Sequence, residues 1–220
     1  MDFARFVDFL KHRLQQPLPG KSAQLKMSSQ ARLRELMNFS DPAGATESSV
    51  LILLYPINGS TGLVLMLRPE YPGVHSGQIS LPGGKFEDSD MTLVNTALRE
   101  SQEEIGIDPA KVQVIGQLTG MYIPPSNFMV TPFIGYSLAQ PKFTADPVEV
   151  AKIIEIEVSD LVEKRFRKMK TMKLSMGMTI RVPSFYINGN IIWGATAMIL
   201  SELAVIVSEF QSEEKKTGEL

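Results

Sequence analysis

The Asn58-Gly59 dipeptide, which stands between two apolar segments, constrains the fold of this chain more than any other feature. Asn-Gly favours the tight turns that join antiparallel strands, because both residues readily adopt positive φ angles. With Thr61-Gly62 it separates the apolar residues 50–55 from residues 63–67. This stretch therefore predicts a β-hairpin, and a β-sheet begins here.

Further elements follow from the spacing of apolar residues between turn-forming residues. The predicted strands are residues 78–81, 112–118, 128–136 and 153–158, with a second hairpin formed by residues 181–186 and 190–193 around Asn188-Gly189. The predicted helices are residues 3–14, 29–37, 92–105 and 195–210. We divide the chain into an N-terminal helical extension packed on the domain (1–46), the main domain (47–210) and a flexible tail (211–220).

The composition excludes several classes of function. The chain has 220 residues and a formal net charge of −2, so nothing attracts it globally to nucleic acid or to an anionic membrane. It has no cysteine, which excludes disulfides and thiolate chemistry. The apolar segments are shorter than the roughly 20 residues that span a bilayer, and the first residues do not resemble a signal peptide. We expect a cytoplasmic protein that binds neither nucleic acid nor membranes.

Three glutamates on the predicted central helix follow a pair of glycines in a predicted loop. Glu100, Glu103 and Glu104 stand at positions i, i+3 and i+4, so their carboxylates project from one face of the helix. A divalent cation is the simplest compensation for their repulsion, and carboxylate oxygens suit Mg²⁺ or Mn²⁺. Gly83 and Gly84 allow the backbone to approach a metal or a phosphate closely. The alternative is an acidic helix face that only contacts solvent.

Residues 84–107 resemble the Nudix box. That pattern is Gly, five residues, Glu, seven residues, Arg-Glu, an aliphatic residue, any residue, Glu-Glu, any residue, Gly and an aliphatic residue. The second half matches from Arg99 to Ile107, with Ser101 at the first aliphatic position. In the first half Asp90 replaces the glutamate, and the segment from it to Arg99 is one residue longer.

The resemblance implies a metal-dependent hydrolase that cleaves a pyrophosphate linkage in a nucleoside diphosphate derivative. It also implies an α/β (α+β) fold in which a mixed β-sheet is sandwiched between helices. Glu100, Glu103 and Glu104 would bind Mg²⁺ or Mn²⁺ or position the attacking water. Arg99 would orient Glu100, and the carbonyl of Gly83 would be a further metal ligand. The catalytic residues implied are thus Arg99, Glu100 and Glu103.

The segments that flank the box resemble the coenzyme A pyrophosphatase branch of the family. The matching positions are Leu67-Arg68, residues 75–84 and 192–197, and Leu18-Pro19-Gly20 with Ala23 and Met27. The resemblance implies cleavage of coenzyme A or its thioesters to 3′,5′-ADP and 4′-phosphopantetheine or its acyl derivative. The substrate-binding residues that we expect are Arg68, His75, Gln78, Gly84 and Lys85.

Several alternatives stay open. Arg68 is equally compatible with a surface ion pair, and His75 with a structural hydrogen bond. Glu149 is the favoured further carboxylate, although a solvated residue after Pro147 would look the same. The basic residues between 164 and 173 either contact the 3′-phosphate of coenzyme A or only solvent. The other functions considered are hydrolysis of ADP-ribose, NADH or a dinucleoside polyphosphate, and non-catalytic nucleotide binding by a regulator; a homodimer is compatible with all of them.

Overall fold

The computed structural model describes residues 1–29, 44–73, 75–173 and 179–218. In this part of the chain the central sheet consists of β1 (Thr46–Ile57), β2 (Ser60–Leu67), β3 (Ile79–Ser80), β4 (Gly83–Lys85), β5 (Gln113–Gln117), β6 (Met121–Ile123), β7 (Phe128–Tyr136) and β8 (Lys152–Glu157). Five strands follow the order β3-β2-β1-β7-β5, while β4 pairs with β1, β6 with β7 and β8 with β2. The sheet is mixed, because β1 runs parallel to β7 and antiparallel to β2.

The predicted first hairpin is confirmed as β1 and β2. Ile57 pairs with Ser60, and the two residues between them, Asn58 and Gly59, have φ angles of 47° and 72°. Positive φ at both central positions is what a type I′ turn requires. Thr61-Gly62 was predicted to belong to the turn, but both residues lie in β2 because the tight turn needs only two residues.

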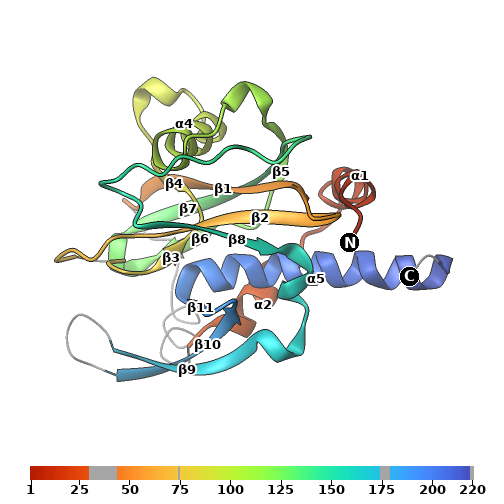
Figure 1. The fold of residues 1–220 in the computed structure, drawn as a ribbon. Helices are drawn as coiled ribbons and strands as arrows, with labels where there is room; N and C mark the ends of the chain where they lie inside the picture. Colours follow the sequence, from red (N-terminus) through yellow and green to blue (C-terminus); the bar gives the residue numbers. More distant parts are fainter. Residues whose placement is uncertain (30–43, 74, 174–178, 219–220) are drawn as a thin grey trace.

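Helices cover both faces of the central sheet (Figure 1). Helix α4 (Leu93–Ile105) lies on one face, and α5 (Gly194–Thr217) and α1 (Phe3–Arg13) lie on the other. Because side chains alternate along a strand, Leu51 and Leu53 of β1 pack in the core with α4, whereas Ile52 and Leu54 pack in the core with α5. The predicted fold class, a mixed sheet between helices, is confirmed.

A separate three-stranded antiparallel sheet packs on the other side of α5 (Figure 1). Its strands are β9 (Arg167–Lys173), β10 (Thr179–Ile187) and β11 (Asn190–Ile192). β10 and β11 are the second predicted hairpin. β9 was not predicted as a strand, since its run of charged residues hides any alternation of apolar and polar positions.

Helix α5 is longer than predicted. Residues 211–217 were expected in a flexible tail, but they continue the helix, and Glu214 forms an ion pair of 2.6 Å with Arg5 of α1. By length and composition alone α5 could cross a membrane, contrary to the expectation that no segment is long enough. However, 61% of its apolar window is buried inside the fold. We therefore interpret α5 as the core helix of the domain.

Glu202, which is fully buried in α5, fastens the N-terminal residues to the domain. Its carboxylate accepts hydrogen bonds from the Gly20 backbone N–H and the Gln24 amide, both at 2.9 Å, and from the Thr119 hydroxyl at 2.7 Å. Gly20 and Gln24 are the ends of helix α2, which is followed by the 3₁₀ turn η1 (Leu25–Met27). The helix predicted over residues 29–37 lies outside the described residues, apart from its first position.

Candidate active site

Helix α4, which carries the glutamates, has a capping residue at each end. The Thr92 side chain accepts a hydrogen bond from the backbone N–H of Asn95, which caps the N-terminus of α4. Gly106, at φ 71°, ends the helix in the left-handed conformation that glycine adopts most easily. The predicted helix is confirmed to within one residue.

The glycine pair is part of the sheet rather than of a loop, which corrects the prediction. Gly83 and Gly84 form β4 with Lys85 and pair with Val50 and Ser49 of β1. At Gly83, a methyl group would overlap the Ser49 carbonyl oxygen, and the φ of 145° disfavours any other residue. A methyl group on Gly84 would overlap the carboxylate of Glu100. The glycines therefore allow β4 to lie directly between β1 and α4.

Arg99 is held by the acidic residue of the loop before the helix. Its guanidinium donates to both carboxylate oxygens of Asp90, at 2.7 and 3.1 Å, and to the Lys85 carbonyl at 3.2 Å. Asp90 is buried and also accepts hydrogen bonds from the Thr96 hydroxyl and the Glu87 backbone. The hydrogen bonds from Arg99 hold the pKa of Asp90 well below its usual value. Although the segment between Asp90 and Arg99 is one residue longer than in the box pattern, Asp90 still contacts Arg99.

Arg99 in turn contacts two of the three glutamates. Its Nη2 lies 2.9 Å from Oε1 of Glu100, and its Nη1 lies 3.0 Å from Oε2 of Glu103. The Glu100 side chain is 16% exposed, and burial raises its pKa although Arg99 acts in the opposite direction. The Glu103 side chain is 57% exposed. The three glutamates thus share a helix but differ in environment.

Glu104 is the most deeply buried carboxylate of the helix, at 2% side-chain exposure. One oxygen accepts a hydrogen bond of 2.8 Å from the Gly83 backbone N–H, and the other lies 3.2 Å from Nη2 of Arg68. Burial raises the pKa of Glu104 to about 7, and the partial compensation by Arg68 and Gly83 does not cancel it. A carboxylate so placed gains from an additional positive charge.

A cavity of about 330 Å³ lies beside β4, α4 and the first turns of α5. The predicted site residues that line it are Arg68, His75, Gln78, Gly83, Gly84, Lys85, Glu100, Glu104 and Glu149. Arg99 and Glu103 do not line the cavity, although Arg99 contacts Glu100, which does. The structure therefore brings most of the predicted site together around one cavity and leaves these two residues outside its lining.

His75 lies in the loop between β2 and β3, and its backbone has a φ of 67°. Residues other than glycine rarely adopt this conformation, which is often retained where a side chain must be aimed. The ring Nδ1 lies 3.4 Å from Oε1 of Gln78. Burial lowers the pKa of His75, which favours the neutral form of the ring.

The residues of the cavity fit a hydrated divalent cation. Among the described residues no three acidic or histidine side chains form a ready ligand cluster, and Glu100 and Glu104 contact Arg99 and Arg68. Mg²⁺ and Mn²⁺ nevertheless keep several waters and need only one or two carboxylates in addition to substrate phosphates. Glu100 and Glu104 can supply these, and Glu149 is close enough to raise the pKa of both.

Several functional features could not be found in the sequence. The spacing of the box left the role of Asp90 open, and only the contacts above show that it holds Arg99. The apolar part of the cavity wall comes from segments far apart in sequence, namely Ile123, Phe128 and Val130 near β7, and Ile199 on α5. No local pattern marks these residues, because only the parallel pairing of β1 with β7 brings them to β4 (Gly83–Lys85), which we call the glycine strand.

The fold is a mixed sheet between helices with a carboxylate-lined cavity, and comparison with known proteins gives the family. The NUDIX domain model matches residues 46–171. The chain is 34% identical over 143 residues to an uncharacterized Nudix hydrolase NudL of Photorhabdus laumondii, covering 64% of this chain and 75% of that protein. The NudL of Yersinia pestis is 34% identical over 147 residues, covering 66% and 72%. This chain therefore belongs to the Nudix family.

Solved structures agree on the fold. The Nudix hydrolase RenU of M. smegmatis has a TM-score of 0.51 at 15% identity, covering 83% of this chain and 94% of that one. An Ap4A hydrolase of C. elegans has a TM-score of 0.50 at 12% identity, covering 75% and 99%. This chain is a Nudix hydrolase of a nucleoside diphosphate derivative, and enzymes of this family use divalent metal ions.

The glycine strand gives a first testable prediction. Gly84→Ala should lower turnover about 100-fold, because the added methyl group displaces the Glu100 carboxylate and small displacements of a catalytic group have effects of that order. Stability should change little, since the flexible end of a glutamate can move aside and the Gly84 φ suits alanine. The measurement is turnover together with thermal unfolding.

Gly120→Ala is the matched control for that substitution. A methyl group at Gly120 would make only an ordinary contact of 3.6 Å with the Val130 carbonyl oxygen. Gly84→Ala with wild-type turnover would show that the position of Glu100 does not depend on the glycine strand.

Glu104 gives a prediction about stability and pH. Its folded pKa of about 7 exceeds the unfolded value of 4.5, so between these values the folded protein binds more protons. Without divalent ions, this group should therefore stabilise the fold at low pH and lose that contribution, up to about 3 kcal/mol, as pH rises through 7. Urea unfolding in chelator at several pH values measures it.

The same titration of Glu104→Gln is the comparison, because glutamine cannot ionise. The stability of the wild type relative to this variant should fall as pH rises. A difference that is constant with pH would contradict the raised pKa of Glu104.

Proposed function

We propose that this Nudix hydrolase cleaves the diphosphate of coenzyme A or its thioesters, and releases 3′,5′-ADP and 4′-phosphopantetheine or its acyl derivative. The observation that carries the proposal is that two segments resembling the coenzyme A branch line one cavity. Arg68, His75 and Gln78 come before the box, whereas Ala195 and Thr196 lie far after it. All five line the cavity that holds the carboxylates of α4.

The chemical character of the wall also favours this class of substrate. Charged and polar groups surround β4, whereas Ile123, Phe128, Val130 and Ile199 make another part of the wall apolar. A diphosphate with a nucleoside on one side and an uncharged arm with methyl and methylene groups on the other matches such a cavity. A dinucleoside polyphosphate, which carries a nucleoside at both ends, matches it less well.

The residues at the polar part of the cavity have distinct proposed roles. Glu100, Glu104 and the Gly83 carbonyl would hold Mg²⁺ or Mn²⁺, with Glu103 and Glu149 as further carboxylates. When bound, the cation supplies neutralisation of charge on the phosphoryl oxygens and a more acidic water. Glu100 accepts the proton of the attacking water.

The two arginines beside the carboxylates have different roles: Arg99 positions a carboxylate, and Arg68 binds the substrate. Arg99 fixes the Glu100 carboxylate through its contact of 2.9 Å, itself anchored on Asp90. Arg68 leaves Glu104, to which it is 3.2 Å distant, and binds a substrate phosphate. His75, Gln78, Gly84 and Lys85 complete the substrate contacts.

We also propose that the enzyme is cytoplasmic and that its partner is a small nucleotide. The net charge of −2 gives the protein no overall attraction to nucleic acid or to an anionic membrane. A homodimer is compatible with this function and is not required by it.

Product analysis tests the proposal most simply. The purified protein with Mg²⁺ or Mn²⁺ is incubated with coenzyme A, ADP-ribose, NADH and a dinucleoside polyphosphate, with a chelator control. We expect metal-dependent release of 3′,5′-ADP from coenzyme A with the highest kcat/KM of the panel. Turnover of another member with coenzyme A untouched would contradict the substrate and keep the family chemistry.

A further inference from the structure

Strands β9 and β10 form a hairpin, residues 167–173 and 179–187, that we call the basic hairpin. It contains Arg167, Lys168, Lys170, Lys173 and Arg181, and the sequence has no acidic residue between positions 164 and 201. The whole chain nevertheless has a net charge of −2. Positive charge is therefore concentrated on one element of an otherwise slightly acidic protein.

Two of these cations already have partners within the protein. The Lys170 ammonium lies 4.4 Å from the centre of the Tyr186 ring. Arg167 donates to the Leu161 carbonyl at 3.2 Å. Lys168 and Arg181 are exposed, and neither forms an ion pair with a carboxylate of the described residues.

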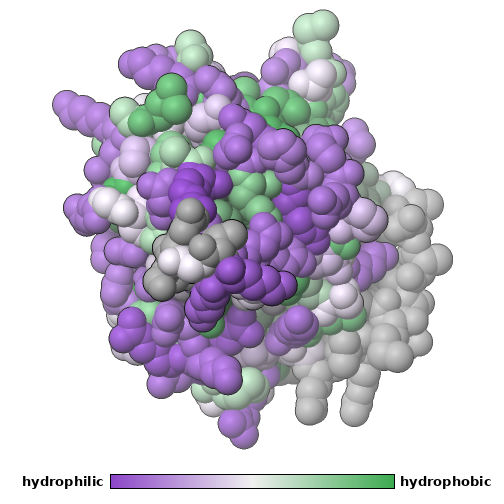
Figure 2. All heavy atoms as spheres, turned by 90° about the vertical axis from the view of Figure 1, so that its right-hand side faces the viewer, coloured by the Kyte–Doolittle hydropathy of each residue, from purple (hydrophilic) through white to green (hydrophobic). Residues whose placement is uncertain are grey.

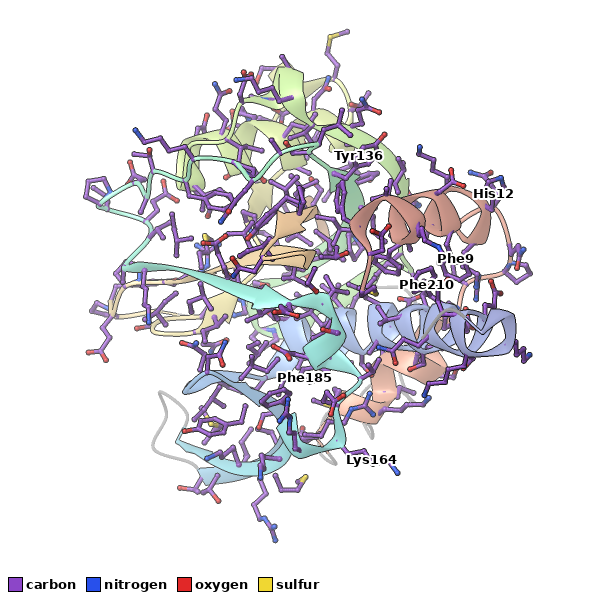
Figure 3. The ribbon with its side chains drawn as sticks, turned by 45° about the vertical axis from the view of Figure 1, so that its right-hand side comes forward. Phe9, His12, Tyr136, Lys164, Phe185 and Phe210 are labelled. Carbon is purple, nitrogen blue, oxygen red and sulfur yellow. The ribbon has the colours of Figure 1, made fainter. Side chains whose placement is uncertain are left out.

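Lys168 and Arg181 lie on opposite faces of the hairpin. Arg181 is four residues from Phe185 along β10, so both project from the same face. Phe185 is fully buried in the core that contains α5 and lies beside that helix (Figure 3). Lys168 pairs with Ser184 and therefore projects from the other face. Arg181 therefore faces the side of the small sheet on which α5 packs, as does Arg167, which pairs with Phe185 itself.

Arg181 also lies beyond the end of α5, where the cavity is. Phe185 is opposite Ile192 in β11, and α5 begins two residues later at Gly194. Ala195 and Thr196, in its first turn, line the cavity. At about 3.3 Å per residue, Arg181 is roughly 13 Å further along β10 than Phe185. Figures 1 and 3 both show the hairpin extending past α5 at the end where the β2–β3 loop projects.

We infer that Arg181 binds the 3′-phosphate on the ribose of the substrate, in a subsite separate from the carboxylates that cleave the diphosphate. This inference rests on the proposed function, because coenzyme A carries that additional phosphate. A guanidinium with no carboxylate partner suits a phosphate, to which it donates two parallel hydrogen bonds. The surrounding cations raise the local concentration of a polyanionic substrate.

The test compares coenzyme A with dephospho-coenzyme A, which lacks only the 3′-phosphate. The wild type should have a lower KM for coenzyme A. In Arg181→Ala, KM for coenzyme A should rise about tenfold, the effect of losing a charge-assisted hydrogen bond. The kcat values, and the KM for dephospho-coenzyme A, should stay near those of the wild type.

Lys168→Ala is the matched control, because it removes the same charge from the other face of the hairpin. It should leave the preference for coenzyme A unchanged. A second readout needs no turnover: in chelator, 3′,5′-ADP should bind the wild type more tightly than 5′-AMP, and Arg181→Ala should remove this difference. Thermal unfolding checks that both variants are folded.

Three results would overturn the inference. Equal KM values of the wild type for the two substrates would show that no 3′-phosphate subsite exists. Equal losses in Arg181→Ala and Lys168→Ala would show general electrostatic attraction instead of a subsite. Turnover of neither compound would mean that the proposed function has failed, and the subsite with it, whereas the first two results leave the proposed function intact.

Discussion

The contact between the glycine strand β4 and helix α4 is the interaction on which the rest of the site depends. Gly84 leaves space that the Glu100 carboxylate fills, and the Gly83 N–H donates to Glu104 at 2.8 Å. Since β4 also pairs with β1, these contacts fix the helix carboxylates relative to the central sheet. The cavity, and the charge that a cation would meet there, follow from this close approach.

The burial of these carboxylates disfavours their charged forms. Burial raises the pKa of Glu100 and Glu104, so two groups suited to a cation are held in an environment that disfavours their charge. Arg68 and Arg99 offset part of this, and Asp90 keeps Arg99 in place. A site built in this way is unstable electrostatically until positive charge enters it, which agrees with the metal dependence of the family.

Local patterns in the sequence predicted the elements that local chemistry decides. The Asn58-Gly59 hairpin, the helix between Thr92 and Gly106, and the glutamates on it follow from turn residues, caps and spacing. Features that depend on pairing between segments far apart in the sequence were not predicted. The charged residues of β9 conceal its strand pattern, and the apolar cavity wall near β7 is assembled only in the folded sheet. The Asp90 contact was also out of reach, because no spacing rule states which residue a longer loop delivers to Arg99.

We propose that Glu100 and Glu104, beside the glycine strand, form the cation site at which the diphosphate is cleaved. A crystal structure with Mn²⁺ and 3′,5′-ADP, analysed by anomalous scattering, would locate the cation. We expect an anomalous peak in the cavity between these two carboxylates, within bonding distance of at least one. A peak only at the exposed Glu103, or outside the cavity, would contradict it.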